Sequence, residues 1–182
     1  MKWQPTDIEG VSILEPSVHR DSRGYFFESF RQEDLRMRGL DIDFVQDNCS
    51  QSVRGTVRGL HYQIGTAAQA KLVLVVRGVI LDVAVDLRKS SPSFGSYVQA
   101  ELSEENHRLL FVPEGFAHGF SVLSEDAVVC YKCSHSYDPD LERGVRWNDP
   151  VLGIDWGVPD PLLSEKDRAQ PLFKELLPED LF

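Results

Sequence analysis

Residues 75 to 83 read V-V-R-G-V-I-L-D-V, and this stretch is the most direct indication of the fold. Two runs of β-branched and aliphatic residues flank Arg77-Gly78, a pattern typical of two antiparallel strands joined by a tight turn. The first run begins at Lys71 and the second continues to Leu87. The stretch therefore predicts a β-hairpin near the middle of the chain.

Similar segments recur along most of the sequence, separated by glycine, proline and serine. The predicted strands are Val11–Glu15, Tyr25–Ser29, Phe44–Ser50, Thr56–Gln63, Lys71–Arg77, Val79–Leu87, Phe94–Leu102, Arg108–Val112, Gly119–Leu123 and Ala127–Ser134. Many short strands with regular turns favour an all-β sandwich or barrel.

Helix is expected only in short pieces, mostly near the C-terminus. Its predicted positions are Arg31–Arg38, which Gly39 closes, Ser164–Arg168 and Lys174–Leu177. No repeat or linker divides the chain, so one domain spanning residues 1–182 is expected. The segment from Tyr137 onward is richer in proline and aspartate, and we expect it to wrap the barrel or cover its mouth.

Composition excludes several classes of protein. The formal net charge is −10, whereas a general nucleic-acid binder needs a basic footprint. No run of about eighteen apolar residues predicts a membrane span. The N-terminus, M-K-W-Q-P-T-D-I-E-G, lacks the apolar core of a secretory signal. A cytoplasmic protein without membrane or nucleic-acid partners is therefore expected.

The three cysteines do not indicate a disulfide framework, because their number is odd and the chain is expected in the cytosol. Cys130 and Cys133 form C-Y-K-C within a predicted strand, where residues three apart point to opposite faces. No second cysteine pair exists to complete a zinc site. Small strand residues are the favoured interpretation over a zinc or redox motif.

The stretch from Val57 to Lys71, V-R-G-L-H-Y-Q-I-G-T-A-A-Q-A-K, carries a candidate base and a candidate oxyanion stabiliser. On a strand, His61 shares a face with Gly59 and Gln63. A histidine takes up a proton near neutral pH, and a lysine in the same cavity stabilises a nearby oxyanion. Together they suit proton abstraction beside a carbonyl. The structural alternatives are a satisfied core histidine at His61 and an ordinary strand-end lysine at Lys71.

The remaining acidic and histidine residues of the strands carry weaker signals. Asp82 alternates with apolar residues, so if it points into the barrel it needs a partner, and His61 would satisfy it. The alternative places Asp82 near solvent. His19, His107 and His135 belong to no motif, and we expect them at the surface.

Residues 111 to 120, F-V-P-E-G-F-A-H-G-F, contain a P-x-G-x-x-H run that resembles the second motif of the cupin superfamily of small β-barrels. In that motif a turn precedes a strand that aims the histidine inward. The first cupin motif supplies further histidines and a glutamate as metal ligands, whereas His61-Tyr62-Gln63 offers one histidine. A metal-free cupin is therefore expected, and the absence of a glycine-rich dinucleotide loop indicates no redox cofactor.

Nine motifs in a fixed order narrow the family further. They are D-S-R-G-Y-F-F-E-S-F (21–30), Q-D-N-C-S-Q-S (46–52), R-G-L-H-Y-Q (58–63), A-K-L-V (70–73), D-V-A-V-D-L-R (82–88), S-P-S-F-G (91–95), P-E-G-F-A-H-G-F (113–120), W-N-D-P (147–150) and L-S-E-K-D (163–167). In this order the chain closely resembles the dTDP-4-dehydrorhamnose 3,5-epimerases of deoxysugar biosynthesis, from about Val11 to Asp167. It departs from them at residues 64–70, I-G-T-A-A-Q-A, where a proline-rich loop is expected.

The resemblance implies four catalytic residues. His61 matches the base, and Asp167 matches the carboxylate that orients it. Lys71 matches the lysine that faces the developing enolate, and Tyr131 the tyrosine that returns a proton from the opposite side of the sugar ring. The alternatives are a core aromatic at Tyr131 and a helix capping box over Ser164–Asp167, which would make Asp167 a local contact.

For the nucleotide, the resemblance implies contacts from both ends of the chain. They are Arg23, Glu28, Gln46, Asn48, Arg58, Lys71, His118, Glu142 and Lys166, with Tyr137 stacking on the thymine. Homodimers are typical of the family, and strands near the N-terminus often cross to the partner. Such a crossing would let Arg23 and Glu28 reach the site of the other subunit.

The implied activity is epimerisation of dTDP-4-dehydro-6-deoxy-D-glucose at C3 and C5, through an enolate, to dTDP-4-dehydro-L-rhamnose. Two alternatives stay open at this stage. One is a single-site epimerase, at C3 or C5 only, or a ketoisomerase, acting on a related dTDP-4-keto sugar. The other is a cupin that binds a nucleotide sugar without turning it over.

Overall fold

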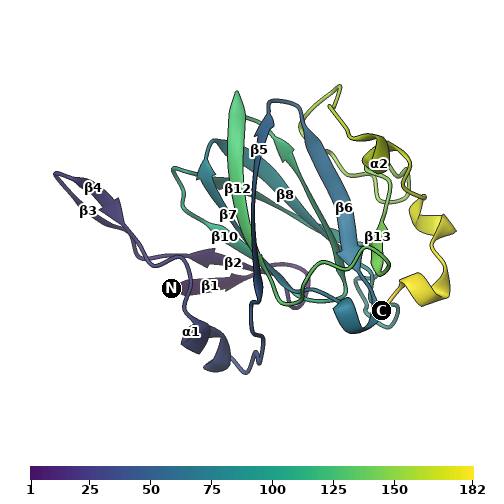
Figure 1. Ribbon diagram of the computed structural model, residues 1–182, viewed down its shortest axis with the longest axis horizontal. Helices are drawn as coiled ribbons and strands as arrows, with labels where there is room; N and C mark the ends of the chain where they lie inside the picture. The colour runs from purple at the N-terminus through teal and green to yellow at the C-terminus, as the bar shows by residue number, and fades with distance from the viewer.

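A computed structural model describes residues 1–182, and two antiparallel β-sheets that face each other dominate it (Figure 1). The six-stranded sheet has the order β1 (Lys2–Pro5), β2 (Ser12–Glu15), β10 (Leu109–Val112), β7 (Lys71–Arg77), β12 (Asp126–Cys133) and β5 (Gln46–Val53). The five-stranded sheet has the order β13 (Glu142–Gly144), β6 (Val57–Gln63), β11 (Phe116–Val122), β8 (Val79–Asp86) and β9 (Tyr97–Ser103). The all-β, cupin-type fold expected from the sequence is confirmed.

The hairpin predicted at residues 75–83 is wrong, although both of its strands exist. β7 pairs with β10 and β12 in one sheet, whereas β8 pairs with β11 and β9 in the other. Gly78 stands at the corner where the chain crosses between the sheets. Its φ is +80°, and a Cβ there would lie 2.1 Å from the carbonyl oxygen of Asp126. Only glycine fits this corner, which directs Val75 and Ile80 into the same core.

The remaining elements lie outside the two sheets. β3 (His19–Asp21) and β4 (Gly24–Phe26) pair only with each other and form an arm that projects away from the sheets (Figure 1). The helices are α1 (Gln32–Arg36), α2 (Glu165–Arg168), η1 (Gly65–Ala67), η2 (Phe173–Glu175) and η3 (Pro178–Asp180). None of them is long and apolar enough to span a membrane.

Sequence patterns located most of these elements but not all. The three-residue strands β3 and β13 and the N-terminal β1 had no prediction, because strands this short show little alternation. The strand predicted at Tyr25–Ser29 ends at Phe26 instead, and β11 begins earlier than predicted, at Phe116. The helices predicted at Arg31–Arg38 and Ser164–Arg168 exist but are shorter, and the one predicted at Lys174–Leu177 is instead the 3-10 helix η2, which begins one residue earlier and ends at Glu175.

Three apolar clusters hold the layers together. The first lies between the sheets and includes Val73, Ile80 and Phe120. The second lies on the outer face of the five-stranded sheet, where Trp156 and partly buried side chains such as Trp147 and Phe182 pack over that wall. The chain from Tyr137 onward therefore wraps the barrel, as expected. The third lies under α1, whose Leu35 contacts the outer face of the six-stranded sheet.

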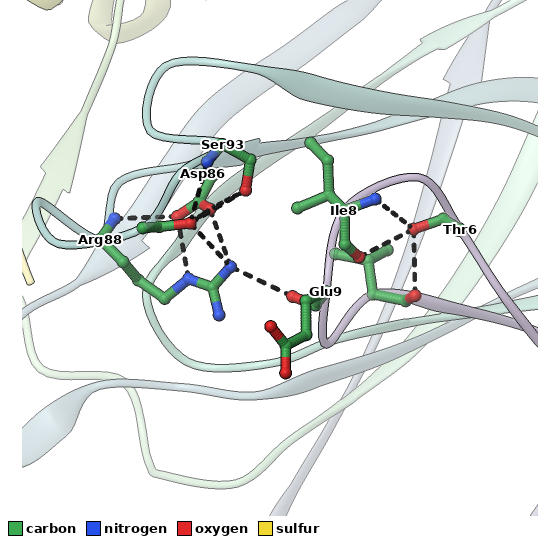
Figure 2. A network of polar contacts seen from close by, with 8 residues as sticks. Thr6, Ile8, Glu9, Asp86, Arg88 and Ser93 are labelled. Atoms are coloured by element: carbon green, nitrogen blue, oxygen red, sulfur yellow. Dashed lines mark hydrogen bonds and ion pairs between the residues drawn. The ribbon is translucent and has the colours of Figure 1, made fainter.

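A buried carboxylate organises the loops at one end of the sandwich (Figure 2). Asp86 is fully buried at the end of β8 and accepts hydrogen bonds from the Arg88 guanidinium at 2.7 and 2.9 Å. The hydroxyls of Ser91 and Ser93 donate to it at 2.6 and 2.7 Å. Arg88 also donates to the carbonyl of Glu9 at 3.1 Å. Burial opposes ionisation of Asp86, but these donors lower its pKa to about 2. The D-V-A-V-D-L-R and S-P-S-F-G motifs thus meet at a structural carboxylate.

We predict that Asp86→Asn lowers the free energy of unfolding by about 3 kcal/mol at pH 7, because the amide cannot accept from all the donors that surround it. Denaturant unfolding measures the loss. Since the pKa is lowered on folding, the carboxylate's contribution is present above its usual value of 3.8 and is lost as the pH falls toward 2. The difference between wild type and variant should therefore shrink below pH 4 or so. Asp41→Asn, at an exposed position, is the control; a constant difference across that window would contradict the prediction.

Candidate functional site

Two adjoining cavities lie between the sheets, of about 170 and 290 Å³. His61, Lys71 and Tyr131 line both. His61 comes from β6 in the five-stranded sheet, whereas Lys71 and Tyr131 come from the neighbouring strands β7 and β12 in the other sheet. The candidate base therefore faces the candidate lysine and tyrosine from the opposite wall.

His61 is held by a carboxylate from α2, which lies against β6 (Figure 1). The Nε2 of His61 lies 2.5 Å from Oδ1 of the buried Asp167. The Ser164 side chain caps α2 by accepting from the Asp167 backbone N–H, and its hydroxyl donates to Oδ2 at 2.8 Å. Ser164 thus caps the helix while Asp167 contacts His61, so the two interpretations of L-S-E-K-D, a helix cap and a carboxylate that orients the histidine, are compatible.

The charge state of Asp167 follows from these contacts. Burial opposes its ionisation, but the hydrogen bond and charge of His61, with the Ser164 hydroxyl, lower its pKa overall. A carboxylate that accepts the Nε2–H of His61 leaves the lone pair on Nδ1. No hydrogen bond of the structure engages that nitrogen, so it is free to take a proton.

Lys71 is buried with almost no compensation for its charge. Its Nζ makes one long hydrogen bond, of 3.4 Å, to the carbonyl of His61. Burial lowers the pKa of Lys71, although Cys133, Asp82 and Glu142 partly oppose that shift. Such an ammonium is stabilised by any anion that enters the cavity.

Tyr131 is half-buried on the same wall. Burial is the main reason that its pKa is raised, and the neighbouring Cys133 adds to the shift. The phenol therefore keeps its proton at neutral pH and can act as a donor.

The larger cavity is lined by two cationic side chains and a histidine. Arg58, His118 and Lys166 reach it from β6, β11 and α2, beside Ser50 and Ser164. The Nε of Arg58 donates to the Ser52 hydroxyl at 2.9 Å. The positive charges of Arg58 and Lys166 make the cavity suited to an anionic ligand on a chain of acidic net charge.

The smaller cavity is lined by amides and aromatic side chains. Gln46, Asn48, Tyr137 and Glu142 line it, and they are connected by hydrogen bonds. Gln46 donates to Asn48 Oδ1 at 3.1 Å and accepts from the Tyr137 backbone at 2.8 Å, and the Tyr137 hydroxyl donates to Glu142 at 2.6 Å. Lys166 pairs with the same carboxylate. Burial opposes ionisation of Glu142, but Lys166 and Tyr137 lower its pKa.

The prediction that His61 would be the partner of Asp82 is wrong. Asp82 does point into the barrel, but its Oδ1 lies 2.7 Å from Nε2 of His118 rather than near His61. β8 pairs with β11, so Asp82 lies diagonally beside His118, while His61 is taken by Asp167. Both residues of this second pair are buried, and the other carboxylate oxygen of Asp82 has no hydrogen-bond partner.

Two glycines allow the two histidines to lie side by side. His61 and His118 are direct neighbours across β6 and β11. Next to them, a Cβ on Gly59 would lie 2.6 Å from the Cα of Gly119, and a Cβ on Gly119 would lie 2.6 Å from the carbonyl oxygen of Arg58. A larger residue at either position would separate the strands that carry the site.

Arg23 and Glu28 are the two candidate residues that the structure does not bring to these cavities. Arg23 lies in the β3–β4 arm and pairs with Asp21 at 2.6 Å, and Glu28 pairs with Arg31 at 2.6 Å. The arm and the strand β6 lie on opposite sides of the molecule (Figure 1). Within one chain, these two candidate residues are therefore separated from the others, which line the two cavities or contact residues that do.

Some lining residues had no prediction. Cys133 and Ser50 point into the site because each lies two residues from a candidate, Tyr131 and Asn48 respectively. Strand alternation was the signal available for both. Cys130 lies on the outer face, with its Sγ 3.4 Å from that of Cys49. No group of three or more His, Cys, Asp or Glu side chains is arranged to hold a metal ion.

Known proteins of one family match this chain over most of its length. The family model for dTDP-4-dehydrorhamnose 3,5-epimerase matches residues 5–175. The dTDP-4-dehydrorhamnose 3,5-epimerase of Methanothermobacter thermautotrophicus is 51% identical over 166 residues, 90% of this chain and 89% of that protein.

Solved structures agree with the family model. A dTDP-6-deoxy-D-glucose-3,5-epimerase from Legionella pneumophila, in complex with dTDP-4-keto-L-rhamnose, superposes with a TM-score of 0.95 at 44% identity, covering 99% of this chain and 96% of that one. A 3'-monoepimerase from Streptomyces bikiniensis, in complex with dTDP-quinovose, gives a TM-score of 0.86 at 38% identity, covering 92% and 86%.

We predict that Lys71→Met leaves the free energy of unfolding unchanged or raises it by about 1 kcal/mol, because an apolar side chain of similar length replaces a buried and poorly paired ammonium. Thermal and denaturant unfolding measure the change. Lys132→Met on the outer face of the same sheet, where the lysine pairs with the exposed Asp47, is the matched control and should stay within roughly 0.5 kcal/mol. A loss above about 2 kcal/mol in Lys71→Met would show that the ammonium is a structural contact.

Proposed function

We propose that this chain, which belongs to the dTDP-4-dehydrorhamnose 3,5-epimerase family, epimerises dTDP-4-dehydro-6-deoxy-D-glucose at C3 and C5 to dTDP-4-dehydro-L-rhamnose. The chain is an isomerase of sugar nucleotides by its family. The observation that supports the mechanism best is the placement of a base and an acid on opposite walls of one cavity. His61 lies on one sheet, and Tyr131 lies on the other beside Lys71.

His61 is the proposed base. The C4 ketone of the substrate acidifies the protons on C3 and C5, and each is removed in turn. Asp167 fixes the Nε2–H of the imidazole, which aims the lone pair of Nδ1 into the cavity. As the imidazole becomes charged, the adjacent carboxylate stabilises it.

Lys71 is the proposed stabiliser of the enolate. When a proton leaves C3 or C5, negative charge develops on the C4 oxygen. An ammonium that is buried and poorly paired gains more from that charge than a solvated lysine would. The same burial that makes Lys71 a weak structural residue thus favours its catalytic role.

Tyr131 is the proposed acid. Inversion requires that the new proton arrive on the face opposite to the base. Tyr131 projects from the sheet opposite His61, and burial keeps its phenol protonated. After each reprotonation the imidazolium of His61 gives its proton to solvent and the phenolate of Tyr131 takes one from solvent, so both residues are restored and no net charge accumulates.

The two cavities suit different parts of a nucleotide sugar. Arg58, His118 and Lys166 would contact the diphosphate, with the guanidinium able to make bidentate bonds. Gln46, Asn48 and Glu142 would contact the nucleoside, and the half-exposed ring of Tyr137 would stack on the thymine. The expected cytoplasmic location stays a prediction.

The alternatives differ in how many carbons exchange protons. A single-site epimerase would use the same base and acid, and the similar 3'-monoepimerase at 38% identity shows that this fold hosts that outcome. The 3,5-epimerases are more similar to the chain, at 44% and 51%. A binding protein would need neither an acid nor a base across the cavity.

Incubation with dTDP-4-dehydro-6-deoxy-D-glucose in deuterated water tests these readings. We predict that deuterium enters at both C3 and C5 and that the product has the L-rhamno configuration, as NMR of the sugar protons would show. Label at one carbon only would support the single-site alternative. Absence of any exchange would reject both enzymatic functions.

Two variants separate the base from the acid. We predict that His61→Ala lowers both exchange and product formation about 10³-fold while dTDP binding persists. Tyr131→Phe should lose inverted product but keep deuterium exchange, because His61 can return a deuteron to the face it deprotonates. Tyr97→Phe, away from the cavities, is the control. Loss of exchange in Tyr131→Phe to the level of His61→Ala would contradict this division of roles.

We also propose that the chain acts as a homodimer in which the arm of one subunit completes the site of the other. Within one chain, neither Arg23 nor Glu28 lines the cavities that they are expected to serve, and the arm that carries Arg23 projects away from the sheets (Figure 1). Tyr25 and Phe26 on the arm are 52% and 71% exposed, which suits residues that a partner covers.

Mixing two variants that each turn over poorly at substrate concentrations well below KM tests this arrangement. In a heterodimer of His61→Ala and Arg23→Ala, one site has an intact His61 from one subunit and an intact Arg23 from the other. We predict that random reassociation restores about one quarter of wild-type turnover, because half of the dimers are mixed and each has one complete site. Differently tagged subunits report the fraction of heterodimer. Full mixing without restored turnover would show that Arg23 acts within its own chain.

A further inference from the structure

The root of the β3–β4 arm contacts the body through a cluster of four side chains. Arg20, Tyr25 and Phe27 belong to the arm, and His107 belongs to the turn between β9 and β10. The sequence placed His107 at the surface, and that prediction is wrong: the residue is only 4% exposed. His107 is buried because the arm aromatics pack on it.

The four side chains form a clamp, in which Arg20, Tyr25 and Phe27 of the arm contact the imidazole of His107. The ring centroids of Tyr25 and Phe27 lie 4.6 and 5.0 Å from that of His107. The Nη2 of Arg20 lies 3.2 Å from His107 Nε2, and its guanidinium stands 5.4 Å above the Tyr25 ring. One imidazole thus contacts both strands of the arm.

The body fixes the direction of that imidazole. His107 has φ of +53°, a left-handed conformation that is unusual for a residue other than glycine. The Asn106 side chain enforces the turn by accepting from the backbone N–H groups of Ser103 and Arg108, at 3.1 and 2.9 Å. The hydrogen-bonded turn therefore holds the imidazole of His107 in place. Because the arm residues pack on that imidazole, the turn fixes the direction of the arm.

The protonation state of His107 agrees with this contact. Arg20 can only donate, so the Nε2 of His107 accepts and its proton lies on Nδ1. Burial lowers the pKa of His107, and the positive charge of Arg20 lowers it further. The imidazole is neutral at neutral pH and keeps the lone pair that Arg20 needs.

Beyond the clamp the arm has no support from its own chain. β3 and β4 pair only with each other, and the hollow beside them is lined by arm residues alone, from His19 to Phe26. The Arg23 side chain, 87% exposed, lies at the tip. The occupant that fits this surface is a second copy of the chain, since Tyr25 and Phe26 are the exposed apolar residues and Arg23 the charge that the partner's anionic ligand requires.

We infer that His107 is a positioning residue, which sets the direction of the arm so that Arg23 enters the partner's site. This inference rests on the proposed role of Arg23 in the other subunit. A loosened arm lowers the effective concentration of Arg23 there, so substrate binding weakens. His61, Lys71 and Tyr131 keep their places, so the proton-transfer steps are unaffected.

His107→Gly tests the clamp without straining the turn, because glycine adopts the left-handed conformation readily. We expect KM to rise about tenfold with kcat changed less than about twofold. His107→Asn, which also tolerates this conformation, is the second variant and should give the same split. Glu105→Ala, at an exposed position of the same turn and outside the cluster, is the control.

Two further measurements isolate the cause. Trypsin should cleave after Arg20 or Arg23 faster in His107→Gly than in wild type, which tests the clamp independently of activity. In the double variant Arg23→Ala/His107→Gly, KM should equal that of Arg23→Ala alone, because His107 acts through Arg23.

The outcomes separate this inference from the function on which it rests. Wild-type KM and wild-type cleavage in His107→Gly, together with a raised KM in Arg23→Ala, would overturn the role of His107. An additive double variant would overturn it as well. An unchanged KM in Arg23→Ala would instead reject the proposed role of Arg23, and cleavage would still report whether His107 holds the arm.

Discussion

A charged group enclosed between two sheets must be paired or must change its protonation state, and this constraint organises the interior of the protein. The two buried carboxylates near the site each have a histidine, Asp167 with His61 and Asp82 with His118. Lys71 alone lacks a close counter-ion. A negative charge that develops on an enolate in this cavity would give Lys71 the counter-ion that the chain itself does not supply. Stability and binding are coupled at Lys71, because the burial that disfavours its charge in the empty cavity strengthens its attraction to an anionic ligand.

The sequence predicted most strands because their residues alternate or run apolar, and it could not say which strands pair. The stretch at residues 75–83 has the same local pattern whether its two strands pair as a hairpin or belong to different sheets, since a glycine suits both a tight turn and a corner. What distinguishes them is whether the partners β10 and β12 are available on both sides of β7, which is information from distant parts of the chain. Asp82 shows the same limit. Its need for a partner was evident, but the choice between His61 and His118 depended on which strand lies beside β8.

Most of the candidate residues line the same two cavities, because ordered motifs carry information on residues that only the fold brings together. His61 and Asp167 are distant in sequence, and no local pattern connects them. Arg23 was identified in the same way, and the single chain does not place it in the site. Residues outside the motifs were missed, and His107 is the clearest case. Nothing in its neighbours predicts burial, since the aromatic rings that cover it come from the arm.

The corner at Gly78 has a consequence for how the protein folds. Since β7 and β8 do not pair, the most apolar part of the chain cannot form an early local hairpin. β8 can pair early with β9, the next strand in the chain, but β7 needs β10 or β12 and the second edge of β8 needs β11, all from more distant segments. Closing those loops costs entropy before the contacts repay it, so refolding on a scale of about milliseconds to seconds is expected. During that time the bare edges of β7 and β8 are open to other chains, and refolding yield should fall as protein concentration rises.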